Sequence, residues 1–182
     1  MNRAVFLDRD GVINRATVTN GRPYPPKSVD RFEFLPGVVQ AVEALNQAGF
    51  KVIVVTNQPD VATGKQRREV VESMHQLLKK TLPVDAIKVC YHQDSDNCSC
   101  RKPKPRMLLD AAEELSLDLP NSYMVGDRWR DVEAGKAAGC MTILVKSDYR
   151  EKQAQDPGAI VSSLLEASQL ILSQRKLIEC NT

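Results

Sequence analysis

Short apolar runs alternate along the chain with segments whose apolar residues recur at helical spacing. The runs are rich in β-branched residues and predict buried strands, and the periodic segments predict amphipathic helices. The predicted strands are residues 4–7, 51–55, 86–90, 123–125 and 141–145. The predicted helices are residues 36–49, 66–80, 107–115, 130–138 and 160–172.

This βαβαβαβαβα order predicts an α/β fold, in which helices on both sides sandwich a Rossmann-like parallel sheet with right-handed crossovers. No repeat, low-complexity tract or linker interrupts the 182 residues, so we predict one domain over residues 1–182. Segments 15–34 and 92–106 are too rich in glycine, proline or cysteine for helices. Loops of that length are usually functional or disordered.

Composition narrows the function classes. Hydrophobic residues make up 42% of the chain and charged residues 26%, as in a typical globular protein. A net charge of +2 and 5% aromatic residues give no basic stripe or stacking platform for nucleic acid, and no case for a membrane surface. Neither a spanning apolar stretch nor a secretory signal is visible. We therefore expect a cytoplasmic protein that acts on a small molecule. We also expect it to be a monomer.

Polar residues with catalytic potential follow four of the predicted strands. They are Asp8 and Asp10, the segment Thr56–Gln58, Arg101 and Lys102, and Asp127 with Asp131. Because the carboxyl ends of parallel strands meet at one edge of a sheet, these residues are expected to converge. Carboxylates, a hydroxyl and a lysine together predict a magnesium site that handles phosphate.

Asp8 and Asp10 leave the first strand two residues apart. Such a pair can share one hard cation through one side chain and one backbone carbonyl, which leaves the second carboxylate free for proton transfer. Taken alone, the pair is equally well explained as an acid-capped turn. The three other polar strand ends favour the catalytic interpretation.

Three cysteines and a histidine cluster between residues 90 and 100. Cys90 and His92 are followed by Cys98 and Cys100, directly before the Arg101-Lys102 pair. Three thiolates and an imidazole suit a closed, structural Zn²⁺ site that would fix the loop presenting the lysine. The alternative is a set of reduced thiols beside a surface histidine.

The remaining cysteines and the second histidine lie outside this cluster. Cys140 is predicted to be a core thiol and Cys180 a thiol of the tail. His75 falls within an amphipathic helical segment and is predicted to be a surface residue.

Four segments resemble the motifs of phosphatases of the haloacid dehalogenase superfamily. They are LDRDG (Leu7–Gly11), VVTNQ (Val54–Gln58), RKPKP (Arg101–Pro105) and GDRWRD (Gly126–Asp131). The resemblance extends from Val5 to about Val145. It implies the following roles: Asp8 as nucleophile, Asp10 as general acid/base, Thr56 and Lys102 as phosphoryl-oxygen ligands, Asp8, Asp10 and Asp127 as Mg²⁺ ligands, and Asp131 as a support for the metal's surroundings.

The spacing of the motifs leaves no room for a large cap domain. Asp10 and Thr56 are separated by 45 residues, many of them in the predicted helix 36–49. The interval from Thr56 to Lys102 accommodates one helix, one strand and the cysteine loop. The resemblance therefore points to the capless branch of the superfamily.

A CxH…CxC loop that ends in RKP is similar to two groups of this branch, the D-glycero-D-manno-heptose 1,7-bisphosphate phosphatases and the histidinol-phosphate phosphatases. The segment at residues 101–115 resembles the heptose group more closely. The chain departs from that group at Arg106, where a glycine is expected, and in segments 15–26 and 59–64. We predict hydrolysis of a heptose bisphosphate through an aspartyl-phosphate, with a histidinol-phosphate phosphatase as the alternative.

Four residues are predicted to bind substrate: Asn57, Gln58, Arg101 and Arg128. The two arginines flank the predicted catalytic lysine and aspartate, and a guanidinium can bind phosphate oxygens in pairs. We expect them to contact a distal phosphate. The alternative is that both are solvated rim charges. Two other classes of protein are possible. The intact pair Asp8 and Asp10 disfavours a zinc-stabilised binding protein without catalytic activity, and the low aromatic content disfavours a nucleic-acid 3′-phosphatase.

Overall fold

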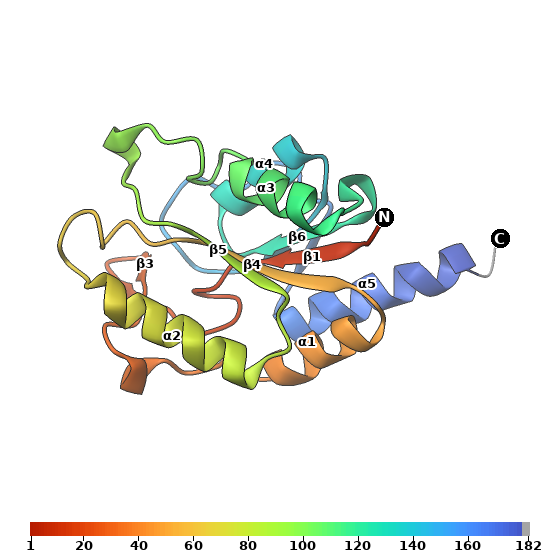
Figure 1. Ribbon diagram of the computed structural model, residues 1–182, viewed down its shortest axis with the longest axis horizontal. Helices are drawn as coiled ribbons and strands as arrows, with labels where there is room; N and C mark the ends of the chain where they lie inside the picture. Colours follow the sequence, from red (N-terminus) through yellow and green to blue (C-terminus); the bar gives the residue numbers. More distant parts are fainter. Residues whose placement is uncertain (180–182) are drawn as a thin grey trace.

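Six parallel strands form the central sheet in the order β5-β4-β1-β6-β7-β8 (Figure 1). The computed structural model describes residues 1–179, with side chains of the last helix described as far as residue 174. The strands are β1 (Ala4–Leu7), β4 (Lys51–Asn57), β5 (Ala86–Cys90), β6 (Tyr123–Gly126), β7 (Met141–Val145) and β8 (Ala159–Val161). All neighbouring pairs in this sheet run parallel.

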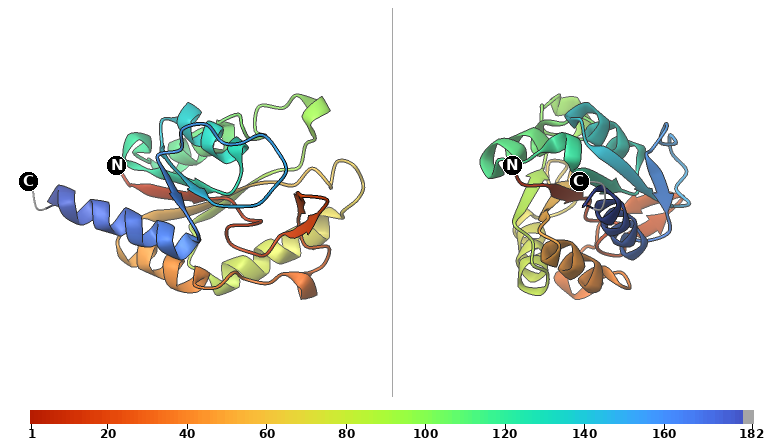
Figure 2. Two further views of the ribbon diagram at one scale, coloured as in Figure 1. Left: turned by 180° about the vertical axis from the view of Figure 1, so that it is seen from behind. Right: turned by 90° about the vertical axis from the view of Figure 1, so that its right-hand side faces the viewer.

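Helices cover both faces of the sheet (Figure 2). One face carries α1 (Val38–Gln47), α2 (Arg68–Thr81) and α5 (Leu164–Glu179), and the other carries α3 (Arg106–Leu115) and α4 (Trp129–Ala138). In β1, Val5 and Leu7 pack toward the first helix layer, whereas Ala4 and Phe6 pack toward the second. Burial on both faces explains why the sequence of β1 is continuously apolar. The predicted α/β sandwich is confirmed.

The predicted closing helix at residues 160–172 begins too early. Ala159–Val161 instead forms β8 against the edge of β7. The Ser163 hydroxyl accepts a hydrogen bond from the Glu166 backbone N–H at 3.2 Å, and the Glu166 carboxylate accepts one from the Ser162 N–H at 2.7 Å. The first of these bonds satisfies a free N–H donor in the first turn of the helix and the second holds the preceding residue, so α5 begins only at Leu164.

The segment at residues 15–34, predicted to be a loop, contains a β-hairpin and a short 3₁₀ helix. The hairpin pairs β2 (Thr17–Thr19) with β3 (Arg22–Tyr24), and the 3₁₀ helix is η1 (Val29–Arg31). The hairpin turn has φ of 53° at Asn20 and 75° at Gly21, the left-handed pair that an Asn-Gly dipeptide favours between two strands. The Asn20-Gly21 dipeptide could therefore have predicted the hairpin from the sequence.

No cap domain interrupts the fold within residues 1–179. The interval between β1 and α1 holds only the hairpin and η1, and the interval between β4 and α2 holds turns. Two further 3₁₀ helices, η2 (Asp94–Asp96) and η3 (Leu119–Asn121), lie in connections. The capless architecture is therefore as predicted.

Cys140 is buried, as predicted, whereas Cys180 lies outside the described residues. Over residues 1–179, none of the helices is both long enough and apolar enough to cross a membrane.

Candidate active site

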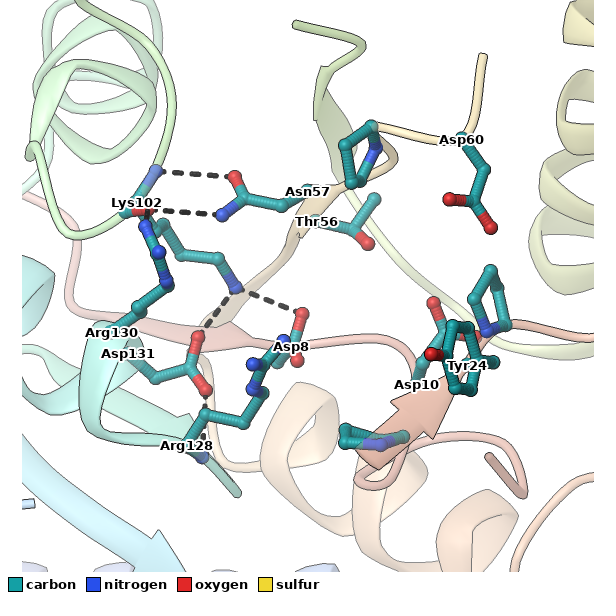
Figure 3. Close-up of a pocket in the computed structure, with 13 residues that line it drawn as sticks. Asp8, Asp10, Tyr24, Thr56, Asn57, Asp60, Lys102, Arg128, Arg130 and Asp131 are labelled. Atoms are coloured by element: carbon teal, nitrogen blue, oxygen red, sulfur yellow. Dashed lines mark hydrogen bonds and ion pairs between the residues drawn. The ribbon is translucent and has the colours of Figure 1, made fainter. Parts of the chain in front are cut away.

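The ammonium group of Lys102 lies between two carboxylates at the carboxyl edge of the sheet (Figure 3). Its Nζ atom is 2.8 Å from Asp8 Oδ1, 2.6 Å from Asp131 Oδ1 and 2.7 Å from the Val55 carbonyl oxygen. Burial alone would lower the pKa of Lys102, but the charges of Asp131 and Asp8 outweigh that effect and raise it. The lysine therefore remains a cation although its side chain is only 2% exposed.

Asn57 holds the backbone of Lys102 through a two-bond clamp. Its Nδ2 donates to the Lys102 carbonyl oxygen at 3.1 Å, and its Oδ1 accepts from the Lys102 N–H at 3.1 Å. The amide of Gln58 donates to Asp10 Oδ2 at 2.7 Å and to Thr56 Oγ1 at 2.9 Å. Asn57 and Gln58, two of the four residues predicted to bind substrate, thus hold other predicted site residues in place.

The carboxylate of Asp10 is oriented by three donors from the protein. Arg9 Nη2 lies 2.9 Å from Oδ2, Asn14 Nδ2 donates to Oδ1 at 2.9 Å, and Gln58 supplies the third bond. Asp10 therefore faces the cavity from the side opposite Lys102 (Figure 3). These donors fix the orientation of the Asp10 carboxylate. Cation binding through the Asp10 backbone carbonyl stays a prediction.

His75 is buried rather than on the surface, so its predicted exposure is wrong. Its Nε2 lies 3.0 Å from Nη1 of the fully buried Arg9. Burial, followed by the neighbouring Arg9 charge, lowers the pKa of His75 to about 4. The neutral imidazole accepts a hydrogen bond from the guanidinium that orients Asp10.

Three buried carboxylates, those of Asp8, Asp127 and Asp131, each place an oxygen within 4.8 Å of the others. Burial raises the pKa of Asp8 to about 6, and burial with the Asp8 charge raises the pKa of Asp127. Asp127 Oδ1 is buried without a hydrogen-bond partner. Three carboxylates beside the single ammonium of Lys102 leave excess negative charge, and together with the unpartnered Asp127 oxygen this fits a hard divalent cation such as Mg²⁺.

Asp131 has a different environment from the other two carboxylates. Its Oδ1 pairs with Lys102, and its Oδ2 accepts a hydrogen bond from the Arg128 backbone N–H at 3.0 Å, at the start of α4. A Cβ atom added at Gly126 would lie 2.1 Å from Asp131 Cβ, so a glycine is needed for this close approach. These contacts suit the supporting role that the resemblance implies.

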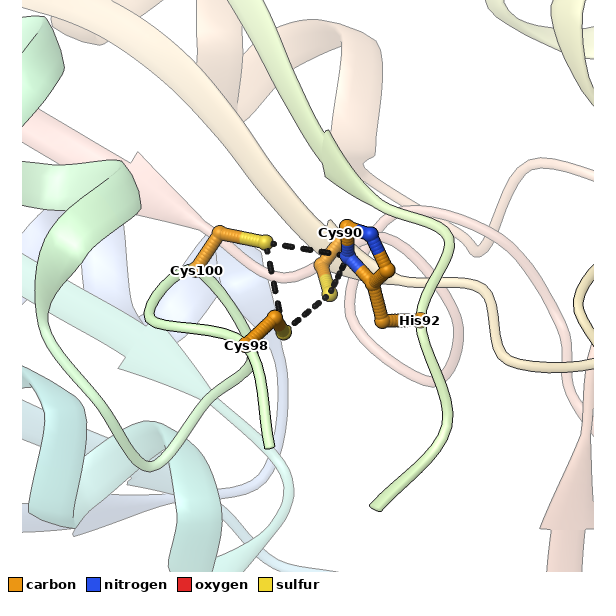
Figure 4. A group of neighbouring side chains, drawn as sticks. All are labelled: Cys90, His92, Cys98 and Cys100. Carbon is orange, nitrogen blue, oxygen red and sulfur yellow. Dashed lines mark hydrogen bonds between the residues drawn. The ribbon is translucent and has the colours of Figure 1, made fainter. Parts of the chain in front are cut away.

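The cysteine loop brings its four predicted ligands together (Figure 4). The Sγ–Sγ separations are 3.7 Å for Cys90 and Cys98 and 3.5 Å for Cys98 and Cys100. His92 Nδ1 lies 3.7 Å from Cys90 Sγ and 3.4 Å from Cys100 Sγ. Tetrahedral Zn²⁺ with bonds of about 2.0–2.3 Å requires ligand separations of roughly 3.4–3.8 Å, so the donor set fits the ion.

The site residues line a cavity of about 150 Å³. Asp8, Asp10, Thr56, Asn57, Lys102, Arg128 and Asp131 contribute to its wall. Tyr24 of the hairpin and Arg130 of α4 also line it and were not predicted. Arg130 lies in the GDRWRD segment, two residues after Arg128. Its place in that motif could have indicated a site residue. Tyr24 was missed because it lies in the hairpin, and the sequence analysis predicted a loop there.

The two arginines predicted to contact a distal phosphate both have acidic partners. Arg128 forms a bidentate ion pair with Glu151, in which Nε donates to Oε1 and Nη2 donates to Oε2. Arg101 Nε lies 2.8 Å from Asp94 Oδ1, and Arg130 pairs with the same carboxylate at 3.1 Å. Arg128 lines the catalytic cavity, whereas Arg101 lines a neighbouring one beside Lys102 and Arg130.

Comparisons with known proteins identify the family of the chain. A HAD-hydrolase-like family model matches residues 99–167. The D-glycero-β-D-manno-heptose-1,7-bisphosphate 7-phosphatase of Escherichia coli K12 is 36% identical over 188 residues, which cover 95% of each chain. The chain belongs to the haloacid dehalogenase superfamily, in the family of these heptose-bisphosphate phosphatases.

Further relatives of this phosphatase family are similar over most of their length. The enzyme of the same name from Pseudomonas aeruginosa is 39% identical over 153 residues, covering 81% of this chain and 83% of the relative. The crystal structure of D,D-heptose 1,7-bisphosphate phosphatase from B. bronchiseptica, in complex with magnesium and phosphate, matches with a TM-score of 0.82 and 32% identity. That match covers 94% of this chain and 99% of the other. The chain is thus a phosphatase with a HAD-type fold.

Proposed function

We propose that this phosphatase hydrolyses one phosphate of a sugar bisphosphate, D-glycero-D-manno-heptose 1,7-bisphosphate, at the C7 position. The curated relatives described above act on that heptose by name, which favours it over histidinol phosphate. The observation that carries the chemistry is the placement of Lys102 between Asp8 and Asp131, with Asp10 held across the same cavity.

The proposed reaction begins at Asp8. Its carboxylate oxygen attacks phosphorus, the bond from phosphorus to the sugar oxygen breaks, and an aspartyl-phosphate forms. Asp10, protonated at that stage, donates its proton to the departing sugar oxygen. The ionised Asp10 then accepts a proton from the water that attacks the aspartyl-phosphate, and inorganic phosphate leaves.

The surrounding residues manage negative charge in both steps. Lys102 and Thr56 hold the phosphoryl oxygens in the proposed complex, and Asp131 keeps Lys102 in position. Asp8 and Asp127, with the Asp10 carbonyl, would hold Mg²⁺, which neutralises phosphoryl charge when bound. The neighbouring enzyme crystallised with magnesium and phosphate supports that choice of ion.

A structural Zn²⁺ at Cys90, His92, Cys98 and Cys100 completes the proposal. All four ligands are protein side chains, so no position remains open for chemistry. The loop formed by residues 90–100 ends immediately before Arg101 and Lys102. A bound zinc ion would hold this loop in one conformation and thereby fix the position of the Lys102 ammonium group.

For the rest of the substrate we propose contacts from Arg101 and Arg128 to the distal phosphate. Each would exchange or share its present carboxylate partner, Asp94 or Glu151. We also propose that residues 1–182 act as one domain and as a monomer. Neither the distal contact nor the oligomeric state is needed for the chemistry at Asp8.

The proposed function is tested by phosphate release from a substrate panel. The panel comprises the heptose 1,7-bisphosphate, its 1- and 7-monophosphates, a hexose bisphosphate and histidinol phosphate, with Mg²⁺ supplied. We expect the heptose bisphosphate to give the highest kcat/KM, with loss of the C7 phosphate by phosphorus NMR. A higher kcat/KM for histidinol phosphate would replace the proposal with its alternative.

A further inference from the structure

The hydroxyl of Tyr149 contacts one oxygen of the Asp127 carboxylate. Its Oη donates to Asp127 Oδ2 at 2.6 Å. The other oxygen, Oδ1, is buried and accepts no hydrogen bond. We propose that Tyr149 is a positioning residue for the catalytic cation: it engages Oδ2 and thereby presents Oδ1 alone to Mg²⁺. This inference rests on the proposed Mg²⁺ site and extends it to a residue outside the four motifs.

The segment around Tyr149 is held against the strand end that carries Asp127 and against the hairpin. Ser147 Oγ donates to the Asp127 carbonyl oxygen at 3.0 Å, and Glu151 forms the ion pair with Arg128. The Arg150 N–H donates to the Gly21 carbonyl oxygen at 2.7 Å, which joins the segment to the hairpin turn. The segment is thus anchored on both sides of Tyr149, at Ser147 before it and at Arg150 and Glu151 after it, which restricts the movement of the tyrosine away from the carboxylate.

Gly11 provides the space for this contact. It has φ of +92°, and a Cβ atom built there would lie 1.9 Å from Asp127 Oδ2 and 2.7 Å from Tyr149 Oη. An L side chain at this position would both strain the backbone and displace the hydrogen-bonded pair. The Leu7–Gly11 motif therefore supplies the carboxylates of Asp8 and Asp10, and its glycine also leaves the space that the Tyr149–Asp127 contact occupies.

The chemical consequence concerns how Asp127 binds a metal. Mg²⁺ requires near-octahedral geometry and usually takes one oxygen from each carboxylate. A carboxylate without an outer partner can rotate or bind through both oxygens, and loss of such partners typically weakens metal affinity by 10- to 100-fold. Tyr149 supplies that partner in this protein.

The test is a calorimetric titration of Mg²⁺ into the zinc-loaded, magnesium-free protein. Tyr149→Phe removes only the hydroxyl. Tyr123→Phe is the matched control, because its hydroxyl lies 3.1 Å from Gln174 Oε1 at the other end of β6. We expect the Mg²⁺ dissociation constant to rise roughly tenfold in Tyr149→Phe and to stay within about twofold of wild type in Tyr123→Phe.

Activity and thermal melting separate positioning from a structural role. The Mg²⁺ concentration for half-maximal activity is expected to rise as much as the dissociation constant, with kcat at saturating Mg²⁺ largely retained. An unchanged or tighter dissociation constant in Tyr149→Phe would overturn the proposal. So would a magnesium-free melting temperature well below that of Tyr123→Phe. If wild type itself binds no Mg²⁺, the proposed metal site fails along with this inference.

Discussion

The imidazole Nε2 of His75 lies 3.0 Å from Nη1 of Arg9, although 66 positions separate the two residues. Arg9 is fully buried and bonds to Asp10 through its other guanidinium nitrogens. A helix on one face of the sheet thus contacts the predicted general acid/base through a single arginine. The contact requires a neutral histidine, because an imidazolium cannot accept a hydrogen bond from the guanidinium.

The first prediction concerns the stability of the protein in acid. The pKa of His75 is about 4 in the folded protein, against an ordinary value of 6.5. Between those values the unfolded chain binds more protons, so the free energy of unfolding falls as pH decreases from 6.5 to 4. His75→Gln removes this titration. From pH 7 to pH 5, wild type should lose about 2 kcal/mol more than the variant in chemical denaturation. Equal losses would contradict the assignment.

Replacing the nucleophile is the second prediction. Asp8→Asn keeps the volume of the side chain but removes the attacking oxygen, so kcat should fall by roughly four orders of magnitude or more. Circular dichroism checks the fold, and phosphate release measures the rate. A loss of less than about tenfold, equivalent to about 1.4 kcal/mol in the barrier, would exclude Asp8 as nucleophile.

For Asp10 the effect should depend on the leaving group. Asp10→Asn removes the proton donor, which should lower kcat on a sugar phosphate by roughly 10²- to 10⁴-fold. An aryl phosphate, whose phenolate needs little protonation to depart, should lose less in its first step. The comparison is a burst experiment with both substrates. The same loss on each would argue against proton donation by Asp10.

Zinc content provides the fourth prediction. Protein purified without chelator should contain one zinc per chain by elemental analysis. Cys98→Ser should lower zinc content, melting temperature and activity together, because the same loop positions Lys102. Cys140→Ala is the matched control, since Cys140 is a buried cysteine outside the cluster, and it should keep its zinc. Zinc-free wild type with full activity would refute the structural site.

The last prediction concerns the distal phosphate. Arg101→Ala and Arg128→Ala should raise KM for the heptose bisphosphate far more than for the 7-monophosphate, because only the bisphosphate has the second group. Arg68→Ala serves as the control, since Arg68 forms an exposed ion pair with Glu72. Equal changes for both substrates would mean that the two arginines do not contact the distal phosphate.

The sequence by itself determined the architecture of the sheet and the place of the chemistry. Apolar runs marked β1, β4, β5, β6 and β7, and parallel topology requires their carboxyl ends to share an edge. Asp8, Thr56, Lys102 and Asp131 were therefore expected to converge before any contact was known. The convergence of Cys90, His92, Cys98 and Cys100, the proposed zinc ligands, was equally predictable, because they lie within eleven consecutive residues.

Only the tertiary structure decided the partners that orient these groups. Arg9 with His75, Asp127 with Tyr149, and Asn57 with the Lys102 backbone are contacts between different elements. Periodicity describes which face of an element is apolar, but it cannot assign a polar side chain to one partner. β8 likewise exists because β7 offers it an open edge. Such contacts depend on how elements pack, and packing is a property of the folded chain.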